Sequence, residues 1–406
     1  MKMTAAVLSI GNELLRGNVI NTNAAFLGRE LSARGIEVIT HAVAPDSEEA
    51  IRFHLEALTR RVDLIITCGG IGPTPDDVTR EGIAAYCKVP LVFSKKSYRG
   101  IEALYKKFRK RVPPLVKKEA FFPEGAKPLI NRFGVAFGFS VETKGKLVIS
   151  LPGVPTELKN MYFDVVLPLL KKRFQKTTPA RRLVVKMAGI SEPDVMKKLG
   201  KDFFSDHFDF GIYPEAGEIS IRILCDQNSV LHRLQKKIRA RLRDFIYAWE
   251  DRSLSLVVGD ILRKKKQTLA VAESCTGGLL ATEITHHPGA SVFFKGGVVA
   301  YHHKVKESLG VSSESVKKYG EVSSQVAREL AVSVRSRMKT DHSIGITGIA
   351  GPDGGSQKKP VGLVYIGLAG PKGKPRTWKY RFWGDRNQIQ KRAATKALEL
   401  LWRSVR

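Results

Sequence analysis

The sequence predicts an α/β protein with more than one domain. Short apolar runs alternate with longer helical patterns through residues 1–170, and polar or glycine-rich clusters follow several of the apolar runs. At 406 residues, the chain is longer than one ordinary hydrophobic core requires, so two or three domains are expected. The hydrophobic fraction of 43% is typical of a globular protein. We place the domains at residues 1–170, 171–252 and 253–406.

Residues 1–170 are predicted to form a parallel sheet covered by helices. Strands are expected at residues 5–10, 38–43 and 63–68, and helices at residues 21–34 and 48–60. The run 63–68 is largely apolar, as in a strand that is buried on both faces. Strands and helices that alternate in this way imply a parallel sheet with right-handed crossovers, whose ligand binds beyond the C-terminal ends of the strands.

Three polar clusters fall at these predicted strand ends, around residues 11–23, 69–79 and 151–157. Glycines there allow backbone N–H groups to approach a phosphate, and adjacent carboxylates can hold a divalent cation against it. The alternative is a set of tight turns, in which Asp76 and Asp77 begin the next helix. The candidate nucleotide-site residues are Glu13, Asn23, Gly69, Gly70, Thr74, Asp76, Asp77 and Glu157, with Asp76 and Asp77 as the candidate metal ligands.

The pattern changes in residues 171–252. Strands are expected at 182–187 and 218–224, the second of which alternates as a half-buried strand does. Helices are expected at 192–199 and, with a basic composition, at 230–247. The segment therefore predicts a small α/β module.

Residues 253–406 begin with an amphipathic helix at 254–262 and then reach a distinctive stretch at 268–280. An apolar run ends at Glu273-Ser274-Cys275-Thr276, two glycines follow, and a helical pattern continues. A hydroxyl at such a corner is held rigidly and faces a helix N-terminus, whose unpaired N–H groups attract anions. The alternative is an ordinary turn in which Ser274 or Thr276 is the N-cap.

A serine nucleophile needs a neighbouring base. The candidate histidines (His286, His287, His302 and His303) occur as adjacent pairs in polar surroundings, which favours surface positions over a triad. A lysine serves as a base when burial or a nearby positive charge lowers its pKa. Residues 297–301 are apolar and are expected to be buried, which places Tyr301 and Lys306 at the end of a buried segment.

Residues 1–170 resemble the N-terminal domain of the CinA family, itself similar to the three-layer MoaB/MogA molybdopterin-binding fold. The matching pieces are Asn12-Glu13-Leu14-Leu15, Asn21-Thr22-Asn23, Gly69-Gly70-x-Gly-Pro-Thr74-x-Asp76-Asp77 and Leu151-Pro152-Gly153-Val154-Pro155-x-Glu157. In part of that family, the domain hydrolyses ADP-ribose with a divalent metal. Where the family usually has Gly-Thr-Ala-Pro-Gly, this sequence has Gly134-Val135-Ala136-Phe137-Gly138. This departure predicts nucleotide binding with altered or absent turnover.

Residues 171–252 resemble the small module that CinA proteins carry between their larger domains, similar in topology to a KH domain. RNA-binding KH domains clamp the backbone with a G-x-x-G loop. No such loop occurs between Lys171 and Tyr247, so a spacer or dimer-forming module is favoured over RNA binding.

Residues 253–406 closely resemble the CinA C-terminal domain, which hydrolyses the carboxamide of nicotinamide mononucleotide to nicotinic acid mononucleotide and ammonia without a cofactor. The resemblance rests on residues 272–278, on Tyr301 with Lys306, and on residues 347–355. It implies Ser274 as the nucleophile, Lys306 as its base and Tyr301 as an assisting hydroxyl. The substrate-binding residues it implies are Thr276, Gly277, Gly278, Thr347, Gly348, Gly351 and Arg386, with N–H groups near Thr276 and Gly277 holding the oxyanion.

Two departures from the family pattern concern substrate binding. His302-His303 stands where Ser-Asn is usual, and Gln390 stands where Arg is common. Loss of that arginine predicts weaker phosphate binding.

The formal net charge of +29 favours anionic partners. Solvated surface is the preferred reading of the Lys and Arg runs, followed by attraction of metabolites and then by nucleic-acid binding. Four cysteines without a C-x-x-C pair predict a reducing cytoplasm, and no stretch is apolar enough to span a membrane.

Three functions remain open from the sequence. The first is amide hydrolysis of nicotinamide mononucleotide, and the second is an N-terminal ADP-ribose hydrolase or nucleotide sensor that uses a divalent metal. The third is an interaction protein linked to competence and DNA damage. A homodimer is expected, and no membrane or specific nucleic-acid partner is expected.

Overall fold

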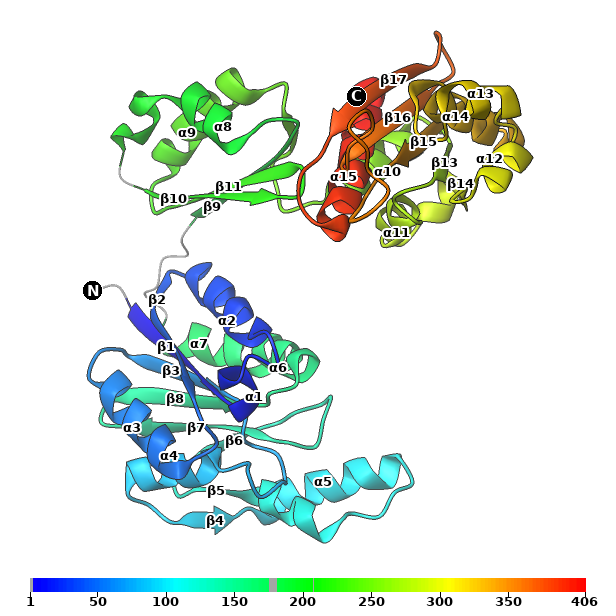
Figure 1. Cartoon of the computed structure of the whole chain (residues 1–406). Coiled ribbons are helices and arrows are strands. Elements are labelled where there is room, and N and C mark those ends of the chain that lie inside the picture. The colour runs from blue at the N-terminus through cyan, green and yellow to red at the C-terminus, as the bar shows by residue number, and fades with distance from the viewer. Residues whose placement is uncertain (1–2, 175–180, 207) are drawn as a thin grey trace. The chain divides into compact units, whose positions relative to one another are not determined.

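The computed structural model describes residues 3–174, 181–206 and 208–406 of the chain. Two compact units are present, residues 1–181 (unit 1) and residues 182–406 (unit 2). Both contain sheets and helices that alternate along the chain (Figure 1). The α/β class expected from the sequence is confirmed.

Unit 1 contains a six-stranded sheet. In sheet order its strands are β2 (Ile36–Ala44), β1 (Met3–Ile10), β3 (Leu64–Cys68), β8 (Lys146–Leu151), β7 (Gly138–Thr143) and β6 (Lys127–Leu129). The first four strands are parallel, and β7 and β6 are antiparallel to their neighbours. The sheet is therefore mixed, where a parallel sheet was expected. The reason is the two-residue turn Lys144-Gly145, whose positive φ angles of 50° and 75° suit a tight hairpin between β7 and β8.

Helices cover both faces of this sheet and make the expected three layers (Figure 1). One face packs against α2 (Thr22–Ser32), α6 (Pro155–Met161) and α7 (Leu167–Arg173). The other packs against α3 (Glu48–Thr59), α4 (Thr79–Cys87) and α5 (Lys95–Lys107). All five residues of β3 are buried, because both of its faces are covered. The remaining elements are α1 (Asn12–Leu15), the 3₁₀ helix Pro114–Ala120, the π-helical turn Tyr162–Val166, and the antiparallel pair β4 (Leu91–Phe93) and β5 (Phe121–Pro123).

Unit 2 begins with a four-stranded sheet in the order β10 (Asp209–Glu215), β11 (Glu218–Cys225), β9 (Arg181–Ala188) and β12 (Ile246–Ala248). The helices α8 (Glu192–Leu199) and α9 (Asn228–Leu242) and the 3₁₀ turn Lys201–Ser205 belong to the same module. The expected helix 230–247 is too long, because α9 ends at Leu242 and Tyr247 lies in β12.

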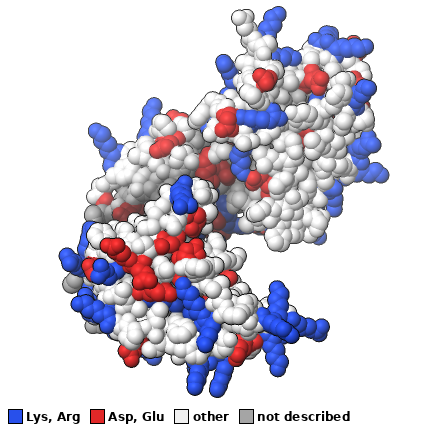
Figure 2. Space-filling view, turned by 60° about the horizontal axis from the view of Figure 1, so that its bottom comes forward, with Lys and Arg blue, Asp and Glu red and all other residues white. Residues whose placement is uncertain are grey.

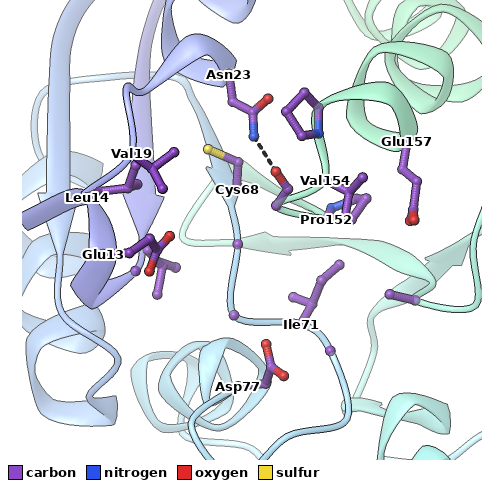
Figure 3. Close-up of a pocket in the computed structure, with 18 of the residues that line it drawn as sticks. Glu13, Leu14, Val19, Asn23, Cys68, Ile71, Asp77, Pro152, Val154 and Glu157 are labelled. Carbon is purple, nitrogen blue, oxygen red and sulfur yellow. Dashed lines mark hydrogen bonds between the residues drawn. The ribbon is translucent and has the colours of Figure 1, made fainter. Parts of the chain in front are cut away.

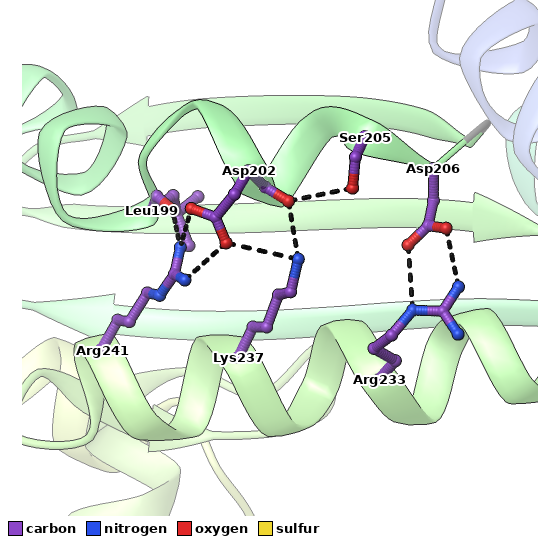
Figure 4. Close-up of polar contacts among 7 residues, drawn as sticks. All are labelled: Leu199, Asp202, Ser205, Asp206, Arg233, Lys237 and Arg241. Carbon is purple, nitrogen blue, oxygen red and sulfur yellow. Dashed lines mark hydrogen bonds and ion pairs between the residues drawn. The ribbon is translucent and has the colours of Figure 1, made fainter.

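The basic helix α9 is partly neutralised within its own module (Figure 4). Arg233 forms a two-point ion pair with Asp206, and Arg241 forms one with Asp202, at shortest distances of 2.6 Å. Hydrogen bonds from Arg241 and Lys237 lower the pKa of Asp202 to about 2. These three cations of α9 are engaged within the module, and its role as a spacer or dimer-forming module remains a prediction.

The rest of unit 2 is a five-stranded sheet with helices on both faces. Its strands, in sheet order, are β14 (Phe294–Val299), β13 (Leu269–Glu273), β15 (His342–Gly348), β16 (Leu363–Ala369) and β17 (Arg376–Arg381). The first three are parallel, and the last two are antiparallel. The helices are α10 (Leu254–Lys264), α11 (Leu279–Thr285), α12 (His303–Leu309), α13 (Ser313–Tyr319), α14 (Ser324–Met338) and α15 (Arg386–Val405), with a 3₁₀ turn at Ala290–Val292.

The small module shares a hydrophobic core with this larger sheet. Ala188 and Tyr247 belong to the same buried cluster as the α10 and α15 side chains, and Arg403 of α15 donates to the carbonyl oxygen of Ala188 at 3.4 Å. This shared core makes residues 182–406 one compact unit. The predicted boundaries at 170/171 and 252/253 remain predictions.

The expectation that residues 297–301 are buried is correct for Ala300 and wrong for the rest of the segment. The edge strand β14 alternates between half-buried and exposed residues, and Tyr301 is 55% exposed. An edge strand has only one neighbour, so its apolar composition does not imply burial on both faces.

Within the described part of the chain, no helix combines the length and apolar character needed to cross a membrane. Lys and Arg side chains project from much of the face seen in Figure 2. In unit 1 they concentrate in residues 95–111, where every Lys and Arg is exposed. No ion pair joins any of these cations to a carboxylate among the residues described.

Candidate functional site

Ser274 lies directly after β13, an interior strand of the five-stranded sheet, and is held by backbone hydrogen bonds. Its N–H donates to the carbonyl oxygen of Ile346 in β15 at 3.0 Å, and its own carbonyl accepts from Gly277 N–H at 3.0 Å. The residue is 7% exposed. The expected rigid corner is therefore present.

The helix that follows is capped from an unexpected direction. The buried carboxylate of Glu273 accepts from the N–H groups of Gly278, Leu280 and Ala281 at 2.8–3.1 Å. Gly278 is the N-cap residue of α11, with φ 100°, so neither Ser274 nor Thr276 takes that role. An acidic residue directly before an S-x-T-G-G turn was the available sequence signal.

Strands on both sides of β13 bring other groups to this corner. The N–H of Ala300, just after β14, donates to the carbonyl oxygen of Glu273 at 2.7 Å. Tyr301 and Lys306 follow on that side. On the other side, Thr347 and Gly348 end β15, and Ile349 to Gly351 follow it. Three parallel strand ends therefore place these segments around Ser274.

Lys306 is almost completely buried, at 1% exposure, on the short helix α12. Its Nζ donates to the carbonyl oxygen of Tyr301 at 2.8 Å and to Oε2 of Glu321 at 2.9 Å. Burial agrees with the expectation for a base, but the charged partner is a carboxylate rather than a cation. Among the described residues, no hydrogen bond joins Ser274 to Lys306.

Arg386, the first residue of α15, connects two candidate segments. Its guanidinium donates to the Tyr301 hydroxyl at 2.8 Å and to the carbonyl oxygen of Gly351 at 2.7 Å. The structure thus brings together three of the predicted residues at one place. Asp385 caps this helix through a capping box, which fixes Arg386 as the first residue of α15.

Thr347 and Cys275 have structural partners. The buried Thr347 hydroxyl donates to the carbonyl oxygen of Glu321 at 2.8 Å, so it fixes a loop instead of facing a free space. Burial raises the pKa of the Cys275 thiol to about 12, which makes this cysteine a poor nucleophile. Gly348 leaves room for that thiol, because a Cβ there would lie 3.0 Å from the Cys275 sulfur.

Thr276 carries a buried hydroxyl with no hydrogen-bond partner. The N–H groups of Gly277 and Gly278 already donate within the turn, to Ser274 and Glu273. Gly277 was expected to supply an oxyanion donor, but its N–H is engaged. Among the described residues, the Thr276 side-chain hydroxyl is buried without a partner, which is costly unless a ligand supplies one.

Unit 1 has a pocket of about 480 Å³ at the C-terminal ends of β1, β3 and β8 (Figure 3). Asn23 faces Gly153 across it and donates to the Gly153 carbonyl oxygen at 2.7 Å, while the buried Asn23 Oδ1 has no partner. No Lys or Arg is among its described lining residues. The predicted residues in the lining are Glu13, Asn23, Gly69, Gly70, Asp76, Asp77 and Glu157, and Thr74 is not in it.

Thr74 instead holds the two aspartates. Its hydroxyl contacts Oδ1 of Asp76 and Oδ2 of Asp77, each at 2.5 Å, and its N–H donates to Asp77 Oδ2 at 2.9 Å. The Thr74 hydrogen bond lowers the pKa of Asp76. Within the described residues, no three His, Cys, Asp or Glu side chains form a metal cage. Two carboxylates fit a Mg²⁺-type cation that keeps waters and takes its other ligands from substrate phosphates.

Glu119 is a pocket residue that the sequence reasoning missed. It is fully buried in the 3₁₀ helix, and neither carboxylate oxygen has a partner. Burial raises its pKa to about 7, although the positive charge of Arg80 acts in the opposite direction. The acid stands between two lysines and alanine (K-K-E-A), a pattern that gives no signal of burial.

The two departures in the 134–138 loop have different positions. Val135 lines the pocket, whereas Phe137 is buried in the hydrophobic core beneath α5. Asn131 Nδ2 donates to the carbonyl oxygen of Ala136 at 3.2 Å and to Glu157 Oε2 at 2.6 Å, which ties this loop to the pocket. Only the loss of the hydroxyl at position 135 therefore changes the pocket surface.

Comparison with known proteins identifies the family. Residues 251–405 match the CinA C-terminal domain, and residues 6–172 match the family described as "Probable molybdopterin binding domain". Over 411 residues the chain is 38% identical to a protein of Halothermothrix orenii and 40% identical to one of Moorella thermoacetica; both alignments cover 100% of this chain and 99% of the relative. Both relatives are named "Putative competence-damage inducible protein". The chain belongs to the CinA family.

Among solved structures, the CinA protein of Thermoplasma acidophilum is 34% identical and covers 42% of this chain and 96% of its own, with a TM-score of 0.38. Membership in the CinA family confirms the predicted resemblance for the N-terminal and C-terminal domains, which the two family matches cover at residues 6–172 and 251–405. The molybdopterin-domain match confirms the MoaB/MogA-like fold of unit 1. The residue roles within CinA sites remain predictions for this chain.

Proposed function

We propose that the C-terminal part of unit 2 hydrolyses the carboxamide of nicotinamide mononucleotide. The observation that carries the proposal is the buried Ser274 turn. An unpartnered Thr276 hydroxyl lies beside it, and a buried lysine lies on α12, the helix that follows the neighbouring strand β14. Ser274 attacks the carboxamide carbon, the Thr276 hydroxyl donates to the developing oxyanion, and Lys306 moves the proton. An ester intermediate is then cleaved by water.

Substrate binding would use the groups that converge on Arg386. Its guanidinium can take a phosphate, and Tyr301, whose hydroxyl accepts from it, faces the same place. Gly348 and Gly351 keep the adjacent loop close to the strand ends. Gln390 donates to the carbonyl oxygen of Cys275 at 2.7 Å, so it supports the turn and adds no positive charge for the phosphate.

The test is ammonia release from nicotinamide mononucleotide by the full-length protein. We expect Ser274→Ala and Lys306→Ala to lose about 100-fold or more of kcat, as removal of a nucleophile or its base does. Cys275→Ala is the matched control and should keep most of the activity. Wild-type rates in the Ser274 or Lys306 variant would refute the assignment.

A second function is proposed for unit 1: hydrolysis of ADP-ribose with a divalent cation, or binding of that nucleotide as a sensor. The acidic pocket supports it, since diphosphates approach carboxylates when a cation lies between them. Asp76 and Asp77 would hold that cation and Thr74 would orient them. Cleavage of ADP-ribose that requires Mg²⁺ and is lost in Asp76→Ala supports the hydrolase, whereas binding without cleavage supports the sensor.

A further inference from the structure

The loop between α13 and α14 supplies the charged partner of Lys306. Oε2 of Glu321 accepts from Lys306 Nζ at 2.9 Å, and Oε1 lies 3.9 Å from Nδ1 of His303. The Glu321 side chain is 42% exposed, whereas the lysine is buried. The carboxylate therefore connects a buried ammonium with the surface of the candidate site.

Glu321 is fixed at its backbone as well as at its side chain. Its carbonyl oxygen accepts from the Thr347 hydroxyl at 2.8 Å, and Ser323, which caps α14, donates to the carbonyl oxygen of Gly320 at 2.9 Å. Thr347 is the penultimate residue of β15, and Lys306 lies on α12, the helix that follows β14. One residue thus links the two segments that flank Ser274.

The arrangement also limits what Lys306 can do. A buried ammonium without a counter-charge is costly, and Glu321 supplies that charge. The ammonium has three N–H donors, of which Tyr301 and Glu321 accept two. One donor direction is left for Ser274 or for substrate.

We infer that Glu321 is the positioning residue of the proposed amide hydrolysis, holding Lys306 Nζ and taking one of its protons during attack. The inference rests on the proposed function. One proton passes from Nζ to Glu321 Oε2, and the resulting amine takes the Ser274 Oγ proton as the Oγ–C bond forms and the carbonyl π pair moves to oxygen. The C–N bond then breaks, ammonia leaves with the proton from Nζ, and Glu321 returns its proton to Lys306.

Activity measurements separate this role from a structural one. With nicotinamide mononucleotide as substrate, we expect Glu321→Ala and Glu321→Gln to lower kcat by about 100-fold, the usual scale for assisted proton transfer, with KM within about threefold of wild type. Glu321→Asp keeps a carboxylate and should recover part of the loss. Glu314→Ala, at an exposed acid on α13, is the matched control and should not change kcat. Wild-type kcat in either Glu321→Ala or Glu321→Gln would overturn the inference.

A second measurement does not depend on activity. Glu321→Ala leaves the Lys306 charge buried without its partner, so we expect a lower Tm, and the double variant Glu321→Ala with Lys306→Met should recover it. Additive Tm changes would refute the pairing. If the wild-type protein released no ammonia, the proposed function would fail, and this Tm cycle would still decide whether Glu321 holds Lys306.

Discussion

The two candidate sites of this protein share a topological plan but differ in their charged side chains. In each unit, three neighbouring parallel strands end at one edge, β1, β3 and β8 in unit 1 and β14, β13 and β15 in unit 2. The unit 1 pocket is lined by carboxylates and by no Lys or Arg among the described residues. Near Ser274, Lys306 and Arg386 accompany the carboxylates of Glu273 and Glu321. The same topology therefore places both candidate sites at strand ends, and the side chains after each strand give them different charge.

The largest expected difference between the two sites is in how much stability is lost when a turn glycine, Gly69 or Gly277, is replaced by alanine. Gly69 has φ 101°, and a Cβ there would overlap the carbonyl oxygen of Ile10, whereas Gly277 has φ 63° and only Gln390 at 4.0 Å. We expect Gly69→Ala to destabilise unit 1 by more than about 3 kcal/mol and Gly277→Ala to cost about 1 kcal/mol in unit 2. Urea unfolding followed by hydrogen exchange of peptides from each unit measures both. Equal costs at the two positions would contradict the packing difference.

The second difference is in how the stability of unit 1 depends on pH. Burial raises the pKa of Glu119 to about 7 from an ordinary value of 4.5. Between these pH values the folded state keeps a proton that the unfolded state has released, so stability falls as pH rises from about 4.5 to 7, by about 1–3 kcal/mol. Unfolding of unit 1 at pH 5 and pH 8 should show this loss, and Glu119→Gln should reduce it. An unchanged pH slope in the variant would show that another group is responsible.

A third prediction tests the orphan hydroxyl of the Ser274 turn. Thr276→Val removes a buried hydroxyl that has no partner but keeps the side-chain volume, so we expect a gain in stability of up to about 1 kcal/mol. Ammonia release should fall by about tenfold, because one oxyanion donor is lost. Thermal unfolding and the ammonia assay, done together, check both. A variant that loses stability and keeps its rate would mean that the hydroxyl has a structural partner.

The smallest effect is expected at the basic segment 95–111. Its exposed cations predict weak retention on DNA that disappears between about 50 mM and 200 mM salt, as non-specific phosphate contacts do. Replacing Lys106, Lys107, Arg109 and Lys110 by Gln should abolish retention at low salt, with no change in ammonia release. If the wild-type protein stayed bound to DNA at physiological salt, its positive charge would instead be explained by nucleic-acid binding.

Much of the fold and part of each site could be predicted from the sequence. Ser274 and the Gly69 loop were found because an apolar strand ends abruptly at each, which is a local pattern. Glu321 and Glu119 were missed because their importance depends on burial and on partners distant in sequence. Phe137 was one reason to expect altered turnover, and only packing shows that it lies in the hydrophobic core. The β7–β8 hairpin had a readable signal, Lys144-Gly145, between two short apolar runs.

The Glu273 carboxylate occupies the anion-binding N–H groups at the N-terminus of α11. Three N–H groups at this helix end donate hydrogen bonds to the Glu273 carboxylate. A free phosphate or sulfate would therefore have to displace this buried side chain to bind there. Abundant cellular anions should therefore be weak competitors at Ser274, even in so basic a protein. Glu273 thus limits competition from free anions beside Ser274.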